Sequence, residues 1–153
     1  MKDVKLVMKY NLLFVLVVLT SCSLFDGMRK NSFAYSGGDV LPLVVPKGYK
    51  KVELKTDSAG NKIRVFSYPD GAALYFYYGD TTKNTLPIDT SMNIAKFYPA
   101  NVPFYKGQDS SKGLFWRESQ YKNFRFGYRN ITSEREALFD SSVNHAAWQV
   151  LLK

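Results

Sequence analysis

The most regular pattern in the chain is an alternation of apolar and polar residues that begins near residue 50. In KVELK (51–55), Val52 and Leu54 alternate with charged residues, and two further short stretches rich in β-branched and aromatic residues follow at 62–68 and 72–78. The segments DSAGN and PDG, which separate these stretches, contain residues that favour tight turns. The pattern therefore predicts a meander of three antiparallel strands.

The second half of the chain predicts three more strands and then a helix. VPFYKG, GLFWRES and FRFGYRNI are strand candidates separated by the polar connections QDSSK and QYKN. Apolar residues then recur every three to four positions, which predicts an amphipathic helix over 133–150, and SERE (133–136) fits a capping box at its start. We expect an α+β fold, an antiparallel sheet of about six strands with the C-terminal amphipathic helix packed on one face.

Residues 23–46 show no sustained period. They mix charges, glycines and prolines, which is typical of a flexible connection. We expect a tether over 22–40 and a single domain over 41–153, with the apolar residues 40–45 docking as an edge segment.

The beginning of the chain has the three parts of a secretory leader. Lys2, Lys5 and Lys9 form a basic start, residues 12–19 are uniformly apolar, and the small residues Thr20 and Ser21 follow. A membrane-spanning helix needs about 20 apolar residues, so this run is too short to span a membrane. The sequence predicts a signal peptide over 1–21, whether translation starts at the first methionine or at the eighth residue.

The leader ends in LTSC, in which Cys22 is the only cysteine of the chain. This segment resembles the lipobox of bacterial lipoproteins, where an aliphatic and two small residues precede a cysteine. The resemblance covers residues 1–22 and implies lipid on the Cys22 thiol, cleavage before Cys22 and acylation of the new amino terminus. Ser23 stands where an aspartate would favour retention in the inner membrane. The resemblance thus implies a bacterial envelope protein held by its lipid, and we expect it at the periplasmic face of the outer membrane.

Charge suggests an anionic neighbour without identifying it. The chain has 21 basic and 13 acidic residues, and removal of the leader with its three lysines and one aspartate leaves 18 against 12. The basic residues are scattered, which favours a solvated surface of mixed charge over specific nucleic-acid binding. Arg117, Arg125 and Arg129 occupy alternate strand positions and could form an anion-binding stripe on one sheet face. The simpler alternative is that they are only the polar half of an amphipathic sheet.

Residues suited to catalysis are few. The only histidine, His145, falls on the predicted helix and is off the face of Asp140, and no set of cysteines and histidines suits zinc. We therefore expect no metal and no cofactor, and a non-catalytic module that binds or scaffolds an anionic envelope component or a protein partner. The alternative is a small hydrolase acting on envelope glycan through converging carboxylates, for which the candidates are Glu118, Asp70, Asp80 and Asp89.

Overall fold

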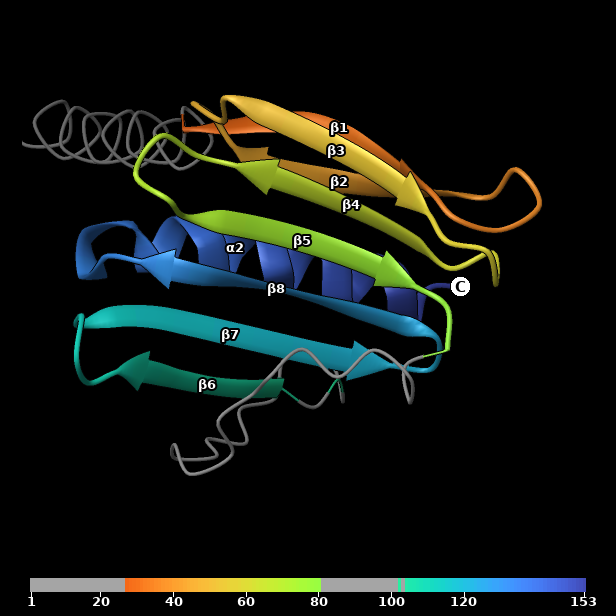
Figure 1. The fold of residues 1–153 in the computed structure, drawn as a ribbon. Helices are drawn as coiled ribbons and strands as arrows, with labels where there is room; N and C mark the ends of the chain where they lie inside the picture. Colours follow the sequence, from red (N-terminus) through yellow and green to blue (C-terminus); the bar gives the residue numbers. More distant parts are fainter. Residues whose placement is uncertain (1–26, 81–101, 103) are drawn as a thin grey trace, which may run out of the picture.

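The computed structural model describes residues 27–80, 102 and 104–153. In chain order the elements of this part are β1 (Met28–Ala34), β2 (Val40–Pro46), β3 (Lys51–Thr56), β4 (Lys62–Ser67), β5 (Ala73–Tyr78), β6 (Phe104–Asp109), β7 (Leu114–Tyr121), β8 (Phe124–Ile131) and α2 (Ser133–Leu151) (Figure 1).

The larger sheet has six antiparallel strands in the order β3-β4-β5-β8-β7-β6. The meander predicted from the alternation near residue 50 is confirmed as β3, β4 and β5. The three later strand candidates and the C-terminal helix are confirmed as well, so the predicted α+β class and the sheet of about six strands are correct.

One face of this sheet is covered by a second layer, which α2 and the β1–β2 hairpin form together. In Figure 1, α2 lies behind β5 and β8, and the hairpin lies beside it behind the upper strands. The helix contacts β2, β7 and β8. The Ser142 hydroxyl of α2 donates to the carbonyl of Val44 and joins the two parts of this layer. The Tyr68 hydroxyl donates to the carbonyl of Pro46 and the Arg64 guanidinium donates to that of Ser32, and both of these bonds join the hairpin to the sheet.

The core between the layers is rich in aromatic rings. Phe139 of α2 packs edge-on against Tyr68 and Tyr128 of the sheet, with ring centroids 5.1 and 5.8 Å apart. Such edge-to-face pairs add about 0.5–1.5 kcal/mol each to the gain from burying the rings. The largest fully buried side chains of the described residues are Tyr128, Phe33, Phe66, Phe76, Phe126 and Phe139.

The structure corrects the tether expected over residues 22–40. Residues 28–34 form β1, which pairs with β2 over seven positions from Met28–Pro46 to Ala34–Val40. Phe33 of β1 is fully buried. Burial of this ring, together with the backbone hydrogen bonds to β2, outweighs the low β-propensity of the polar residues around it. The apolar residues 40–45 do dock on the domain, as β2.

The predicted capping box is wrong. The N-cap of α2 is Thr132, so Ser133 is the first helical residue, and the structure shows no side-chain cap at this end. Glu136 instead lies 2.6 Å from the ammonium group of Lys106 on β6. An ion pair with the neighbouring layer has replaced the local contact that the sequence suggested.

Candidate functional site

A polar network lies between α2 and the β6–β7–β8 end of the sheet, and it centres on Asp140. Arg117 of β7 donates from Nη1 to Asp140 Oδ1 and from Nη2 to Asn144 Oδ1, both at 2.8 Å. The Tyr128 hydroxyl donates to Asp140 Oδ1 at 2.9 Å, and Lys106 Nζ donates to Oδ2 at 2.9 Å. Arg117 is only 4% exposed, so its charge depends on Asp140 for compensation inside the protein.

The titration behaviour of this network follows from its contacts. Burial alone would raise the pKa of Asp140, but hydrogen bonds from Arg117 and Lys106 outweigh burial and lower the pKa. Burial, followed by the charge of Asp140, raises the pKa of Tyr128. Asp140 is therefore held as a carboxylate and Tyr128 as a neutral phenol that donates to it.

A second polar cluster lies on the sheet face opposite α2, and it crosses three strands. Tyr75, Gly127 and Glu118 are register neighbours on β5, β8 and β7. The Tyr75 hydroxyl donates to Glu118 Oε2 at 2.9 Å, reaching over Gly127, where an added Cβ would lie 2.8 Å from that hydroxyl. Glycine at this position therefore leaves room for the hydrogen bond between β5 and β7, the two strands that flank β8.

Arg125 and Arg129 flank this cluster. Arg125 Nε lies 3.2 Å from Glu118 Oε1, and the Arg129 guanidinium lies 5.4 Å from the centre of the Tyr75 ring. Burial raises the pKa of Glu118, although the hydrogen bond from Tyr75 and the charge of Arg125 act in the opposite direction. Burial and the charge of Glu118 both raise the pKa of Tyr75. Both carboxylate oxygens of Glu118 are thus engaged by protein groups.

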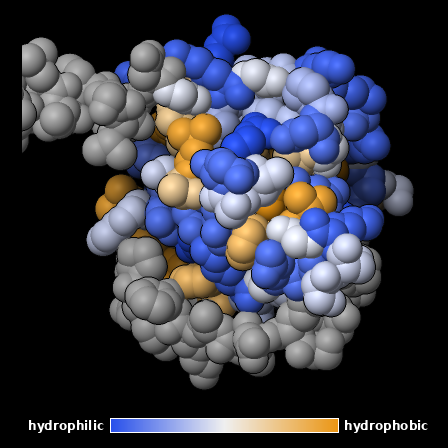
Figure 2. Space-filling model, turned by 90° about the vertical axis from the view of Figure 1, so that its left-hand side faces the viewer, coloured by the Kyte–Doolittle hydropathy of each residue, from blue (hydrophilic) through white to orange (hydrophobic). Residues whose placement is uncertain are grey.

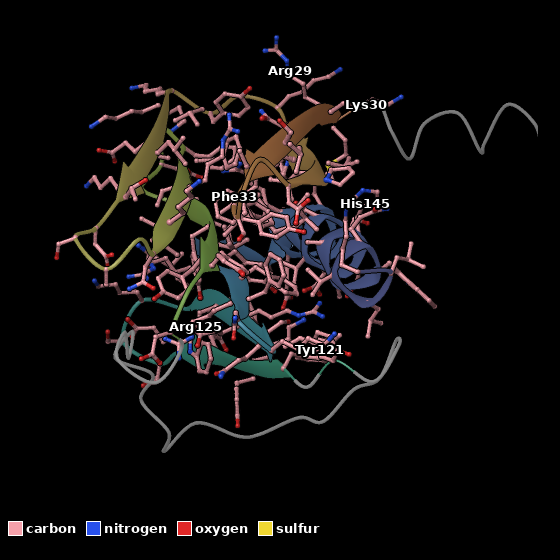
Figure 3. The ribbon with its side chains drawn as sticks, turned by 90° about the vertical axis from the view of Figure 1, so that its right-hand side faces the viewer. Arg29, Lys30, Phe33, Tyr121, Arg125 and His145 are labelled. Atoms are coloured by element: carbon pink, nitrogen blue, oxygen red, sulfur yellow. The ribbon has the colours of Figure 1, made fainter. Side chains whose placement is uncertain are left out.

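The prediction that Arg117, Arg125 and Arg129 share one sheet face is wrong. The hairpin expected across QYKN exists, but its connection pairs Tyr121 with Phe124, and this register places Arg117 opposite Tyr128. Side chains alternate between the two faces of a strand. Arg117 consequently points toward α2 with Tyr128, whereas Arg125 and Arg129 lie on the opposite face. In Figure 3, Arg125 lies on the side of the sheet away from α2, and Tyr121 lies on the side of α2.

The other residues considered for chemistry do not form a site together. Asp70, in the β4–β5 connection, pairs with Arg135 of α2, and Asp80 follows the opposite end of β5. Six residues of strand separate those two ends, which is about 20 Å. Glu118 lies in the middle of β7, and Asp89 falls outside the described residues. His145 is partly buried in α2, and burial lowers its pKa.

The described part of the chain contains no group of three or more metal-ligating side chains that could hold a metal ion. Cys22 lies outside the residues that the structure describes.

The fold also gathers basic residues that look scattered in the sequence. The strands β1 and β3 lie along one edge of the two layers (Figure 1). These strands and the β2–β3 connection carry exposed basic residues, and we name the surface that they form the basic rim. Figure 3 shows its two β1 members extending outward from the molecule. In the sequence, the signal for this surface was the cluster of lysines at 47–55. It could not be interpreted as part of a larger basic surface without β1, a strand that the sequence did not predict. The basic rim consists of Arg29, Lys30, Lys47, Lys50, Lys51 and Lys55.

Comparison of the chain with protein-family models, with curated proteins and with solved structures finds no match. Within the part that the structure describes, none of the helical segments combines the length and the apolar character of a membrane span.

Proposed function

We propose that this chain is a bacterial envelope lipoprotein, held by lipid on Cys22, whose domain is a non-catalytic binding or scaffolding module. The observation that carries the proposal is the position of LTSC, which follows a basic and apolar leader and precedes the first core strand by only a few residues. More than one acyl chain is needed for lasting attachment, because a single chain binds membranes reversibly. Acylation at both the thiol and the new amino terminus of Cys22 would meet that need.

The short distance between Cys22 and β1 limits where such a domain could work. Five residues separate Cys22 from Met28, and extended backbone covers at most about 3.6 Å per residue, so the reach is about 22 Å. The radius of gyration of a domain of this size is about 14 Å, which makes the linker shorter than the domain is wide. A lipidated Cys22 would therefore hold the domain at the membrane surface.

The buried carboxylate of Glu118 and the partly buried one of Asp140 favour binding or scaffolding over hydrolysis. Asp140 accepts hydrogen bonds from Arg117, Lys106 and Tyr128, and Glu118 is engaged by Tyr75 and Arg125. A general acid or base must reach the proton that it transfers, which requires a free oxygen directed at a substrate. These carboxylates are committed to contacts that join strands and layers.

The test of this proposal is the chemical state of Cys22. Intact-mass analysis of the purified wild-type protein should show a chain that begins at Cys22 and carries the mass of acyl chains. Cys22→Ala, which removes the only thiol of the chain, should yield an unprocessed or soluble product. An unmodified Cys22 thiol in the purified wild-type protein would contradict the proposal.

We place the domain at the periplasmic face of the outer membrane. Protease added to intact cells should then leave the domain whole, whereas protease added after the outer membrane is permeabilised should digest it. Removal of the domain from intact cells would show exposure on the cell surface instead.

A further inference from the structure

We propose that the basic rim lies against anionic lipid headgroups of the membrane that carries the anchor. The inference rests on the proposed function in one respect, which is that lipid on Cys22 brings this surface to the membrane. It adds an orientation of the domain, and it names the class of ligand that the rim recognises.

The charge of the protein is concentrated on this rim. Residues 27–30 and 47–55 contain six basic side chains and a single acidic one, Glu53. They therefore contribute five net positive charges, whereas the whole chain without residues 1–21 has six. Lys51 and Lys55 lie 3.0 and 3.7 Å from Glu53, but their side chains remain 65% and 69% exposed. Lys51 and Lys55 thus keep most of their side-chain surface in solvent although Glu53 lies beside them.

Backbone hydrogen bonds hold parts of the rim together at the end of the domain where the described chain begins. The amide of Lys47 donates to the carbonyl of Gly27 at 2.8 Å, and the amide of Lys50 donates to that of Ser67 at 2.8 Å. The first bond joins the β2–β3 connection to the residue that precedes β1. Figure 2 looks onto this end and shows a mostly hydrophilic surface with apolar residues between the polar ones. The rim therefore includes the end of the domain at which the described chain begins, five residues after Cys22 in the sequence.

Two apolar side chains complete the rim. Val52 and Leu54 of β3 are 37% and 57% exposed, and they alternate with Lys51 and Lys55 along this edge strand. Surfaces that bind at the membrane interface combine exposed apolar residues with surrounding cations, because the apolar groups enter the headgroup region while the cations pair with anionic lipid. Lysine on an edge strand also discourages sheet-to-sheet association, which is the simpler explanation that the experiment must separate.

The first measurement is co-sedimentation with vesicles of phosphatidylcholine and phosphatidylglycerol, using residues 22–153 with Cys22→Ser. This chain contains every contact described above, and its circular dichroism confirms folding before use. It should bind these vesicles and not vesicles of phosphatidylcholine alone. Binding should be lost at 1 M salt, where the Debye length is about 3 Å. The proposal is overturned if binding is equal on the two lipid compositions, or if soluble inositol hexaphosphate is bound as tightly as the anionic vesicles.

Two matched triple variants test the location of binding. The rim variant removes three rim charges by replacing Lys30, Lys50 and Lys55 with Gln. The control variant replaces three exposed lysines elsewhere, Lys112, Lys122 and Lys153, with Gln. Each lysine at an anionic surface strengthens binding about fivefold, so the rim variant should bind about 100-fold more weakly. The control variant should bind as the parent does. Equal losses in the two variants would show that only net charge matters and would refute the rim.

The lipidated protein supplies an independent readout. After reconstitution into the anionic vesicles, acylation of free amines followed by peptide mass mapping should find Lys50 and Lys55 protected and Lys112 and Lys122 reactive. A lipidated chain whose rim lysines stay reactive refutes the rim while supporting the anchor. A chain without lipid that still binds vesicles through the rim does the reverse.

Discussion

Removing the Asp140 carboxylate should strongly destabilise the domain. In Asp140→Ala, the buried guanidinium of Arg117 loses its partner carboxylate, and Tyr128 and Lys106 lose an acceptor. Breaking a buried ion pair from one side costs about 3–5 kcal/mol. The Asp140 side chain is 24% exposed, which favours the lower end of that range.

The assay is the thermal or urea unfolding midpoint of the purified variant. A domain of about 130 residues loses about 4 °C of midpoint per kcal/mol, so Asp140→Ala should lower Tm by about 12–16 °C. Asp70→Ala is the matched control, because Asp70 also pairs with an arginine, but its side chain is 40% exposed. Exposed pairs contribute at most about 1 kcal/mol, so the control should shift Tm by about 4 °C or less.

Equal unfolding midpoints of Asp140→Ala and Asp70→Ala would contradict the role assigned to the buried ion pair. A further variant separates charge from contact. Asp140→Leu combined with Arg117→Met replaces the pair by apolar groups, and it should recover most of the loss, since buried ion pairs are often no better than well-packed apolar residues. A double variant as unstable as Asp140→Ala would show that the damage comes from altered packing.

Two further predictions concern buried polar groups. Tyr75→Phe removes the hydrogen bond donated to the buried Glu118 carboxylate, and it should lower the free energy of unfolding in urea by about 1–3 kcal/mol. The control Tyr105→Phe, at a residue 40% exposed, should be neutral. Equal effects of the two variants would contradict the role given to Tyr75. Because the folded pKa of Asp140 lies below its ordinary value of 3.8, its contribution to stability is complete above that value and is lost as pH falls through the folded pKa. Acid unfolding followed by tryptophan fluorescence should therefore show less pH dependence in Asp140→Asn than in the wild type, and identical profiles would contradict this assignment.

The sheet and the helix were predictable because their periods are visible in short windows. The strand β1 was not, since its two buried apolar residues, Met28 and Phe33, are five positions apart. An odd spacing cannot come from one face of a strand, so the segment shows no alternation. Its place in the core comes from β2 and α2, which lie elsewhere in the sequence.

The prediction of an arginine stripe was wrong because a change of one residue in the register of two strands exchanges the faces on which side chains lie. The spacing of Arg117, Arg125 and Arg129 places each on a defined face of its own strand, but the turn decides which faces coincide. The two-residue connection Lys122–Asn123 sets the register, and one residue more or less would have put Arg117 beside the other two. The partners of Asp140 were equally hidden, because they come from three strands that meet only in the folded sheet.

The contact between the β1–β2 hairpin and α2 also limits when the chain can complete its folding during synthesis. Val44 and Ser142, which share a hydrogen bond between the hairpin and α2, are 98 positions apart, and α2 lies at the end of the described chain. During synthesis the hairpin emerges early, while the helix that lies beside it in the second layer emerges last. Until then Tyr68 and Tyr128, which Phe139 of α2 contacts, have no second layer over them. A chain truncated before residue 133 would retain each of the eight described strands and still be a substrate for proteases and chaperones, because its second layer would be half missing.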